Sequence, residues 1–267
     1  MSQKDNEKIR EAIRRKYGSV ALSGPARAGC CSSSCCGGGD DATTGEISVA
    51  LGYSLEELLE APSAANMGLG CGNPLAIASL KPGETVLDVG CGGGFDAFLA
   101  AGAVGETGWV IGVDATPEMV QKARRLADEQ DYANIEFRLG EMENLPVADR
   151  AVDVIISNCV INLSPEKPRV FRELLRVLRP GGRLAISDVV ATADLPAAVK
   201  DDLTLYSSCI AGACTIDELE AMLTEAGFIG IVIRPKEESK TFIRDWAPGM
   251  NAEEFVVSAM IEGVKPG

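Results

Sequence analysis

The sequence predicts an α/β protein whose core is a doubly wound parallel sheet. Segments typical of strands and helices alternate between residues 85 and 190, and the first of these strands runs into a glycine-rich turn. Such alternation is typical of parallel sheets with helices on both faces. At 267 residues, the chain can bury one large core or a core with a smaller additional region.

The segments before the core have a different character. Residues 4–17 are charged, with isoleucines at helical spacing, and predict an amphipathic helix. Residues 24–45 are dominated by Cys, Ser, Gly and Asp and predict a mobile loop. Ser54 followed by Glu57 is a capping-box pattern, which predicts that a short helix begins there.

The core itself is predicted to alternate strands with helices. The predicted strands are 85–89, 109–113, 135–139, 152–157 and 183–188. The predicted helices between them are 95–103, 116–130 and 168–178. Thr116 and Pro117 form an N-cap and first-turn pair, which marks the start of the second helix.

After residue 190, helices near 195–208 and 215–226 and strands near 228–234 and 254–262 are expected to add a cap and edge strands. We therefore divide the chain into three parts. These are an N-terminal helix, Cys/Gly/Ser-rich loop and short helix (1–62), a core of alternating strands and helices (63–190), and a C-terminal α+β region that completes the sheet (191–267).

Composition narrows the classes of function. The net charge of −14 argues against nucleic acid as a partner, because phosphates would be repelled. No apolar run reaches membrane length and no signal segment is evident, so a cytoplasmic protein without a membrane partner is expected. The nine cysteines then indicate metal, metalloid or redox chemistry rather than structural disulfides. With no histidine, the mechanism must use carboxylates, cysteines or no base at all.

The glycine-rich turn after the first core strand has two interpretations. A dinucleotide fingerprint would need a glycine where Phe95 stands. Asp88, Gly90, Gly92 and Gly94 instead form Asp-x-Gly-x-Gly-x-Gly, the pattern found in S-adenosylmethionine-dependent methyltransferases. Glycines let backbone N–H groups approach a cofactor closely. The turn favours S-adenosylmethionine, and an NAD enzyme is the alternative.

Polar residues follow the next strands. Ligands of open α/β sheets bind beyond the carboxyl ends of the strands. Asp114 is suited to accept hydrogen bonds from two ribose hydroxyls, and Glu141 with Met142 to bind the adenine amine and ring. Asn158 completes the predicted cofactor-binding set. The alternative is that Asp114 only caps the helix at Thr116 and that Glu141 is a solvated loop carboxylate.

Three cysteines lie near the predicted cleft. Cys159 follows the fourth core strand, so its sulfur is expected beside the reactive end of the cofactor, although a buried cysteine also serves as a small hydrophobe. Cys71 lies in a turn of small residues that would leave its thiol accessible, or in a plain tight turn. Cys209 ends a predicted helix, five residues before Cys214, and the sequence leaves the roles of these two open.

Four more cysteines are crowded into seven residues at Cys30, Cys31, Cys35 and Cys36. They could trap a soft ion, although their spacing is not that of a zinc site. The alternative is a flexible linker, and we interpret the group as a secondary thiol pool. Cys91 occupies a variable position of the glycine turn.

With these segments in place, the chain resembles the arsenite methyltransferase family over most of its length. The matching segments are residues 68–74, 86–95, 113–119, 138–141, 145–147, 154–165, 178–182 and 209–213. The cofactor segments are shared with many class I methyltransferases. The surroundings of the three cysteines are much more specific.

The resemblance implies a Rossmann-like methyltransferase domain with a C-terminal region that helps to bind arsenic. It implies S-adenosylmethionine as cofactor and arsenite as substrate, with trivalent arsenic held by Cys71, Cys159 and Cys209. It also implies methylated arsenicals as products of a detoxification reaction, an N-terminal cysteine in the redox cycle, and thioredoxin or glutathione as reductant.

Two other functions remain open at this level. One is a class I methyltransferase that acts on another small molecule, such as a quinone or a lipid intermediate. The other is a non-enzymatic thiol protein that sequesters soft metals.

Overall fold

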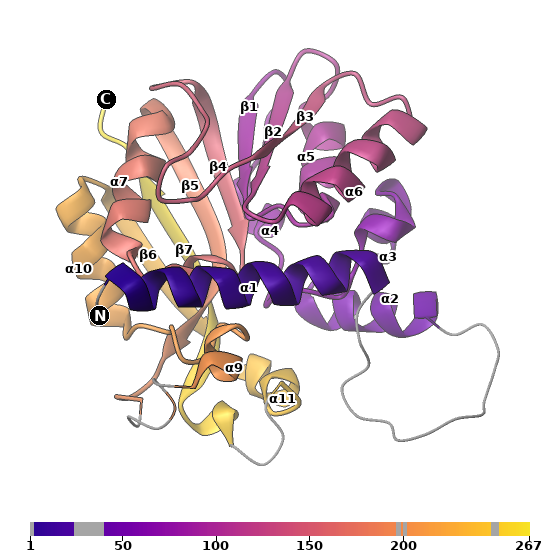
Figure 1. Cartoon of the computed structure of the whole chain (residues 1–267). Coiled ribbons are helices and arrows are strands. Elements are labelled where there is room, and N and C mark those ends of the chain that lie inside the picture. The colour runs from indigo at the N-terminus through magenta and orange to yellow at the C-terminus, as the bar shows by residue number, and fades with distance from the viewer. Residues whose placement is uncertain (1–2, 24–39, 196–198, 200–201, 247–250) are drawn as a thin grey trace, which may run out of the picture.

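The protein is built around one seven-stranded sheet with the order β3-β2-β1-β4-β5-β7-β6 (Figure 1). The computed structural model describes residues 3–23, 40–195, 199, 202–246 and 251–267. The strands are β1 (Thr85–Val89), β2 (Trp109–Asp114), β3 (Ile135–Leu139), β4 (Val152–Asn158), β5 (Leu178–Ala191), β6 (Ile229–Lys236) and β7 (Val256–Val264). Strands β1 to β5 pair in parallel, which confirms the predicted core, and β7 is inserted antiparallel between β5 and β6.

Helices cover both faces of this sheet. The main helices of the core are α5 (Phe95–Val104), α6 (Pro117–Glu129), α7 (Lys167–Val177) and α10 (Ile216–Ala226). Within β1, Val86 packs in the cluster with α5 and α6, while its neighbour Leu87 packs in the cluster with α7 and α10. Both side chains are completely buried, as expected of a central parallel strand covered on two sides.

The shorter helices lie outside this core. They are α2 (Asp40–Leu51), α3 (Leu55–Glu60), α4 (Leu75–Ala78), α9 (Leu203–Tyr206) and α11 (Lys240–Ile243), together with the 3₁₀ turns η1 (Ser63–Ala65), η2 (Ile161–Leu163), η3 (Glu237–Ser239) and η4 (Ala252–Glu254). Of the helix predicted near 195–208, the described residues form chiefly α9. None of the helices in the described ranges is long and apolar enough to cross a membrane.

The N-terminal predictions had mixed outcomes. The predicted helix exists as α1 (Gln3–Ser23), and the capping box is formed, with the Glu57 N–H donating to Ser54 Oγ at 3.1 Å. The loop prediction for 24–45 was wrong for residues 40–45, which belong to α2. Tertiary contacts hold this helix against weak local propensity, such as the 3.0 Å hydrogen bond from Ser48 Oγ to Asn66 Oδ1. The four cysteines at 30, 31, 35 and 36 lie outside the described residues.

The strand order reverses between β1 and β4, and this reversal locates the ligand crevice. Helix α1 lies across the same end of the sheet (Figure 1) and packs on α6 and α9. A segment from the start of the chain therefore covers the edge where the predicted site residues meet.

Candidate functional site

The turn after β1 needs glycine for conformational and steric reasons. Gly90, Gly92 and Gly94 have φ angles of 73°, 50° and 92°, in the left-handed region that favours glycine. A Cβ on Gly90 would lie 2.4 Å from the Val160 side chain, and one on Gly94 would lie 2.8 Å from the Phe137 ring. The turn is thus closely packed by these two side chains.

Asp114, at the end of β2, fixes this turn. Its Oδ2 accepts a hydrogen bond from the Gly92 N–H at 2.9 Å, and its Oδ1 accepts one from the Thr116 N–H at 2.8 Å. The helix-end contact considered from the sequence is therefore present. Hydrogen bonds from the Ala115 N–H and the Thr116 side chain also act on this carboxylate. Its role toward the ribose hydroxyls remains a prediction.

Three carboxylates, those of Asp88, Asp96 and Asp114, gather beside the turn. Asp88 is 2% exposed, and its Oδ2 has no hydrogen-bond partner among the described residues. Burial, together with the charges of Asp96 and Asp114, raises the pKa of Asp88 well above its usual range. Burial also raises the pKa of Asp96 to about 6, although hydrogen bonds from Tyr53 and Asn158 act against it.

This charge distribution distinguishes the two cofactor interpretations. The pyrophosphate of a dinucleotide would add negative charge to the buried carboxylates. S-adenosylmethionine carries a sulfonium and an ammonium group, and positive charge relieves their repulsion. The donor set of the turn and the unpartnered Asp88 oxygen therefore fit S-adenosylmethionine.

Asn158, at the end of β4, joins this acidic group to the first thiol segment. Its Nδ2 donates to Asp96 Oδ2 at 3.2 Å and to the Gly72 carbonyl oxygen at 2.8 Å. Its Oδ1 accepts from the Cys71 N–H at 3.0 Å. Tyr53, which donates to Asp96 Oδ1 at 2.5 Å, completes the cluster. Nothing in the sequence singles out Tyr53 or Asp96 as site residues, and they are identified only by these hydrogen bonds in the folded structure.

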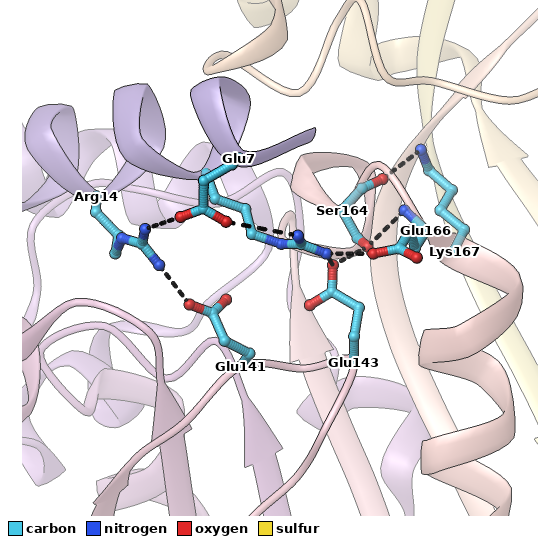
Figure 2. A network of polar contacts seen from close by, with 8 residues as sticks. Glu7, Arg14, Glu141, Glu143, Ser164, Glu166 and Lys167 are labelled. Atoms are coloured by element: carbon cyan, nitrogen blue, oxygen red, sulfur yellow. Dashed lines mark hydrogen bonds and ion pairs between the residues drawn. The ribbon is translucent and has the colours of Figure 1, made fainter. Parts of the chain in front are cut away.

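The predicted adenine contacts lie at the end of β3, under α1. Glu141 accepts a hydrogen bond from Arg14 Nη1 at 2.7 Å (Figure 2), so it is ion-paired and not a free solvated carboxylate. Burial raises the pKa of Glu141, and Arg14 partly offsets the rise. Met142 is half-buried against the core cluster that includes α7. Their role toward adenine remains a prediction.

Three thiols from distant segments meet beside this region. The Cys71 and Cys159 sulfurs and a carboxylate oxygen of Asp188 all lie within 4.8 Å of one another. The Cys209 thiol donates to the Cys159 carbonyl oxygen at 2.9 Å. Cys71 and Cys209 are 1% and 2% exposed, so the interpretation of the Cys71 turn as accessible was wrong.

The cluster favours protonated thiols. The neighbouring thiols of Cys209 and Cys71, together with burial, raise the pKa of Cys159 well above its usual range. For Cys209, the Cys159 thiol lowers the pKa, but burial and the charge of Asp188 outweigh it and leave the pKa raised. A thiolate here would be a buried negative charge close to a carboxylate.

Two of the three cysteines have strained backbones. Cys159 and Cys209 have φ angles of 56° and 62°, a region that costs a non-glycine residue about 1–2 kcal/mol. Hydrogen bonds hold the turn after Cys159, because the Ile161 N–H donates to Asp188 Oδ2 at 2.8 Å and Asn162 Nδ2 donates to Asp188 Oδ1 at 2.9 Å. Strain that is held in this way is typical of functional sites.

Asp188 was not singled out from the sequence. It lies near the carboxyl end of β5, and the strand-end rule that selected Asp114 would have found it. Two further cysteines, Cys91 and Cys214, lie in the described residues. The thiol of Cys91 lies 3.8 Å from the Gly92 oxygen, and that of Cys214 lies 3.9 Å from the Gly212 oxygen.

Comparison with known proteins gives a consistent result. A family profile described as "Methyltransferase domain" matches residues 80–227, more than half of the chain. An arsenite methyltransferase of Halobacterium salinarum is 51% identical over 269 residues, covering 100% of this chain and 69% of that protein. One from Aquipseudomonas alcaligenes is 41% identical over 174 residues, covering 62% of this chain and 50% of that protein.

A solved structure agrees with these relatives. The crystal structure of an arsenic(III) S-adenosylmethionine methyltransferase from Chlamydomonas reinhardtii matches with a TM-score of 0.63 and 33% identity, covering 82% of this chain and 73% of that one. The resemblance noted from the sequence motifs is thereby confirmed. The chain belongs to the arsenite methyltransferase family, whose members are S-adenosylmethionine-dependent enzymes built on the methyltransferase domain.

Proposed function

We propose that this enzyme transfers a methyl group from S-adenosylmethionine to trivalent arsenic bound by Cys71, Cys159 and Cys209. The observation that carries the proposal is that the Cys71 and Cys159 sulfurs lie within 4.8 Å of each other, with the Cys209 thiol 2.9 Å from the Cys159 carbonyl oxygen. The Asn158 side chain contacts both the Cys71 segment and Asp96, next to the cofactor turn. Thiolates are the preferred ligands of a soft ion such as trivalent arsenic.

The first step is exchange of ligands on arsenite. Neutral arsenous acid has three hydroxyl groups, and each can leave as water when it takes the proton of a cysteine thiol as an arsenic–sulfur bond forms. The raised pKa values of Cys159 and Cys209 suit this step, because the thiols keep the protons that the leaving hydroxyls need. Neutral reactants give a neutral complex, so the buried site need not hold an unpaired charge.

The second step is methyl transfer. When bound, S-adenosylmethionine supplies an electrophilic methyl group on a sulfonium. The glycine turn and Asp114 would hold the cofactor so that the arsenic lone pair, positioned by the thiols, could accept this methyl group, with S-adenosylhomocysteine as the other product. No proton leaves the nucleophile, so no general base is needed, which suits a chain without histidine. Positioning by the glycine turn and the thiols can then contribute about 7–11 kcal/mol to lowering the barrier.

The third step restores trivalent arsenic. Methylation formally oxidises arsenic by two electrons, and two of its cysteine ligands return them by forming a disulfide as their bonds to arsenic break. The trivalent arsenic then carries the methyl group and one sulfur, and it gains a hydroxyl from water with release of one proton. The sulfurs of Cys71 and Cys159 lie within 4.8 Å, so this pair suits such a step. Thioredoxin or glutathione would then reduce the disulfide by thiol exchange, with one of the N-terminal cysteines as an intermediate carrier.

Methylated arsenicals released in this way would serve detoxification. A cytoplasmic location suits the cycle, because cytosolic reductants keep thiols reduced.

A single-turnover assay tests the proposal. Purified protein is mixed with S-adenosylmethionine, arsenite and a thiol, and arsenic species are separated by chromatography and detected by mass. We expect methylated arsenic from the wild-type protein and from the control Cys214→Ser, but none from Cys159→Ser. Arsenic that binds without methyl transfer would instead favour sequestration. Neither binding nor transfer would favour a methyltransferase with an organic acceptor.

A further inference from the structure

Helix α1 contacts the segment that carries the third thiol through two adjacent side chains. Lys16 Nζ donates to the Ser207 carbonyl oxygen at 2.9 Å and to Ser208 Oγ at 3.0 Å. The Tyr17 hydroxyl donates to the same Ser207 oxygen at 3.3 Å. These contacts join parts of the chain about 190 residues apart, and the two residues contacted, Ser207 and Ser208, directly precede Cys209.

The Cys209 segment needs such support because it is short and strained. It follows α9, which has only four residues, and Cys209 has a left-handed backbone with a φ of 62°. Its N–H donates to the Tyr206 carbonyl oxygen at 3.1 Å. A small change in this turn would redirect the sulfur away from Cys159, since Cys209 Sγ lies 2.9 Å from the Cys159 oxygen.

The rest of α1 is fixed independently of this contact. Arg14 lies between Glu7 of its own helix and Glu141 of the loop after β3, at 2.9 Å and 2.7 Å (Figure 2). Arg10 pairs with Glu143, which is 5% exposed, at 3.1 Å. The helix is therefore held to the core by its arginines, so Lys16 and Tyr17 project from a fixed support.

Tyr17 also packs against the hydrophobic cluster near the thiols. It is half-buried against the hydrophobic cluster that contains Cys71 and Cys209. Burial raises the pKa of Tyr17 well above its usual range.

We propose that Lys16 and Tyr17 are positioning residues that hold the Cys209 turn so that Cys209 serves as the third arsenic ligand. The inference rests on the proposed function. It predicts that their removal loosens one arsenic–sulfur bond and leaves the other two and the cofactor turn unchanged. A purely structural contact would affect folding without changing the arsenic coordination number.

The variants are Lys16→Met, Tyr17→Phe and the double variant, which remove donors and keep most of the side-chain volume. Arg15→Met is the matched control, because Arg15 lies on the same helix and pairs only locally with Glu11 in the described structure. Cys209→Ser is the reference for a lost ligand. Each protein is loaded with arsenite alone, and X-ray absorption gives the number of sulfur neighbours. Calorimetry gives the affinities for arsenite and S-adenosylhomocysteine.

We expect three sulfur neighbours in the wild-type protein and Arg15→Met, and two in Cys209→Ser. The double variant should approach two and bind arsenite about tenfold more weakly, as the loss of these hydrogen bonds implies. Its affinity for S-adenosylhomocysteine should be unchanged. The Lys16→Arg variant keeps a cationic donor at this position, so arsenic should keep three sulfur neighbours in it.

Three sulfur neighbours and wild-type arsenite affinity in the double variant would overturn the inference and leave the proposed function intact. Fewer than three in the wild-type protein would contradict the proposed ligand set, and the inference with it. If the double variant melts at a much lower temperature, the inference is tested with the Tyr17→Phe single variant, which keeps the ring. The two measurements are again the number of sulfur neighbours and the arsenite affinity.

Discussion

The Asn158 side chain accepts a hydrogen bond from the Cys71 N–H at 3.0 Å, and this contact joins the proposed arsenic site to the proposed cofactor site. The same side chain donates to Asp96 beside the glycine turn, at 3.2 Å. One amide thus sets the distance between the segment that would hold the nucleophile and the one that would hold the methyl donor.

Replacing this amide should lower the activity toward arsenite and weaken cofactor binding. In Asn158→Ala the Cys71 N–H and the Asp96 carboxylate each lose a partner, and each lost buried hydrogen bond costs about 1–3 kcal/mol. We expect kcat/KM for arsenite to fall by about 10–100-fold, with weaker binding of S-adenosylhomocysteine in calorimetry. Asn144→Ala, at an exposed position, is the control. Unchanged kinetics in Asn158→Ala would remove the proposed link.

Gly212 should be essential for the position of Cys209. A Cβ at this residue would lie 2.0 Å from the Asn162 backbone oxygen, so alanine must displace one of the two thiol-bearing loops. We expect Gly212→Ala to bind arsenite at least about tenfold more weakly, since overpacking costs about 1–3 kcal/mol. Binding of S-adenosylhomocysteine should be retained.

The matched control for this variant is Gly102→Ala. Gly102 lies in α5, and a Cβ there would meet nothing within 4 Å. Alanine should raise the free energy of unfolding by up to about 1 kcal/mol, as helix propensity predicts. Wild-type arsenite affinity in Gly212→Ala would show that the loops tolerate the shift.

Asp114 has two separable roles, which a cycle that combines one protein variant with one ligand analogue can distinguish. Its carboxylate holds the Gly92 N–H, and we predict that it also binds the ribose hydroxyls. Asp114→Asn should weaken binding of S-adenosylhomocysteine by about 10–100-fold, a loss typical of hydrogen bonds to charged groups. The loss should be smaller for the 2′-deoxy analogue, which lacks one of the hydroxyls. Equal losses in calorimetry would assign Asp114 to the turn alone.

Cofactor affinity should depend on pH near 6 through Asp96. Burial raises the pKa of this carboxyl to about 6, so it loses its charge as the pH falls through that value. A cationic ligand favours the ionised form, so the affinity for S-adenosylmethionine should fall between pH 7.5 and 5.5, by at most tenfold per pH unit for one group. The neighbouring Asp88 titrates with it, so the observed midpoint belongs to the pair.

The stability of the unliganded protein should depend on the charge of Asp96 in the opposite direction, and should rise as the pH falls. Because the folded-state pKa of about 6 lies above the ordinary value of 3.8, the folded state holds more protons between these values, and stability from Asp96 is lost as the pH rises through 6. Asp96→Asn should flatten both dependences in calorimetry and thermal unfolding. A pH-independent affinity in the wild-type protein would show that Asp96 does not act on the cofactor.

The sequence alone determined the core of this fold and its cofactor motif, because both depend on local signals. Strand β1 occupies the predicted residues, and the glycines that follow it have the positive φ angles such a turn needs. The alternation of buried strands with amphipathic helices can likewise be predicted from the pattern of apolar residues within short segments. Cys71, Cys159 and Cys209 were selected by their local surroundings before any contact was known.

Tertiary structure decided what local signals do not encode. Helix propensity did not predict that residues 40–45 belong to α2, since packing overrides weak propensity. Nor did it predict that α1 crosses the sheet edge and reaches Ser207, because such a contact joins segments far apart in the chain. The burial of Cys71 and the gathering of Asp88, Asp96 and Asp114 arise in the same way. The repulsion among buried charges and the backbone strain at a site arise only when segments far apart in the sequence pack together in the folded protein.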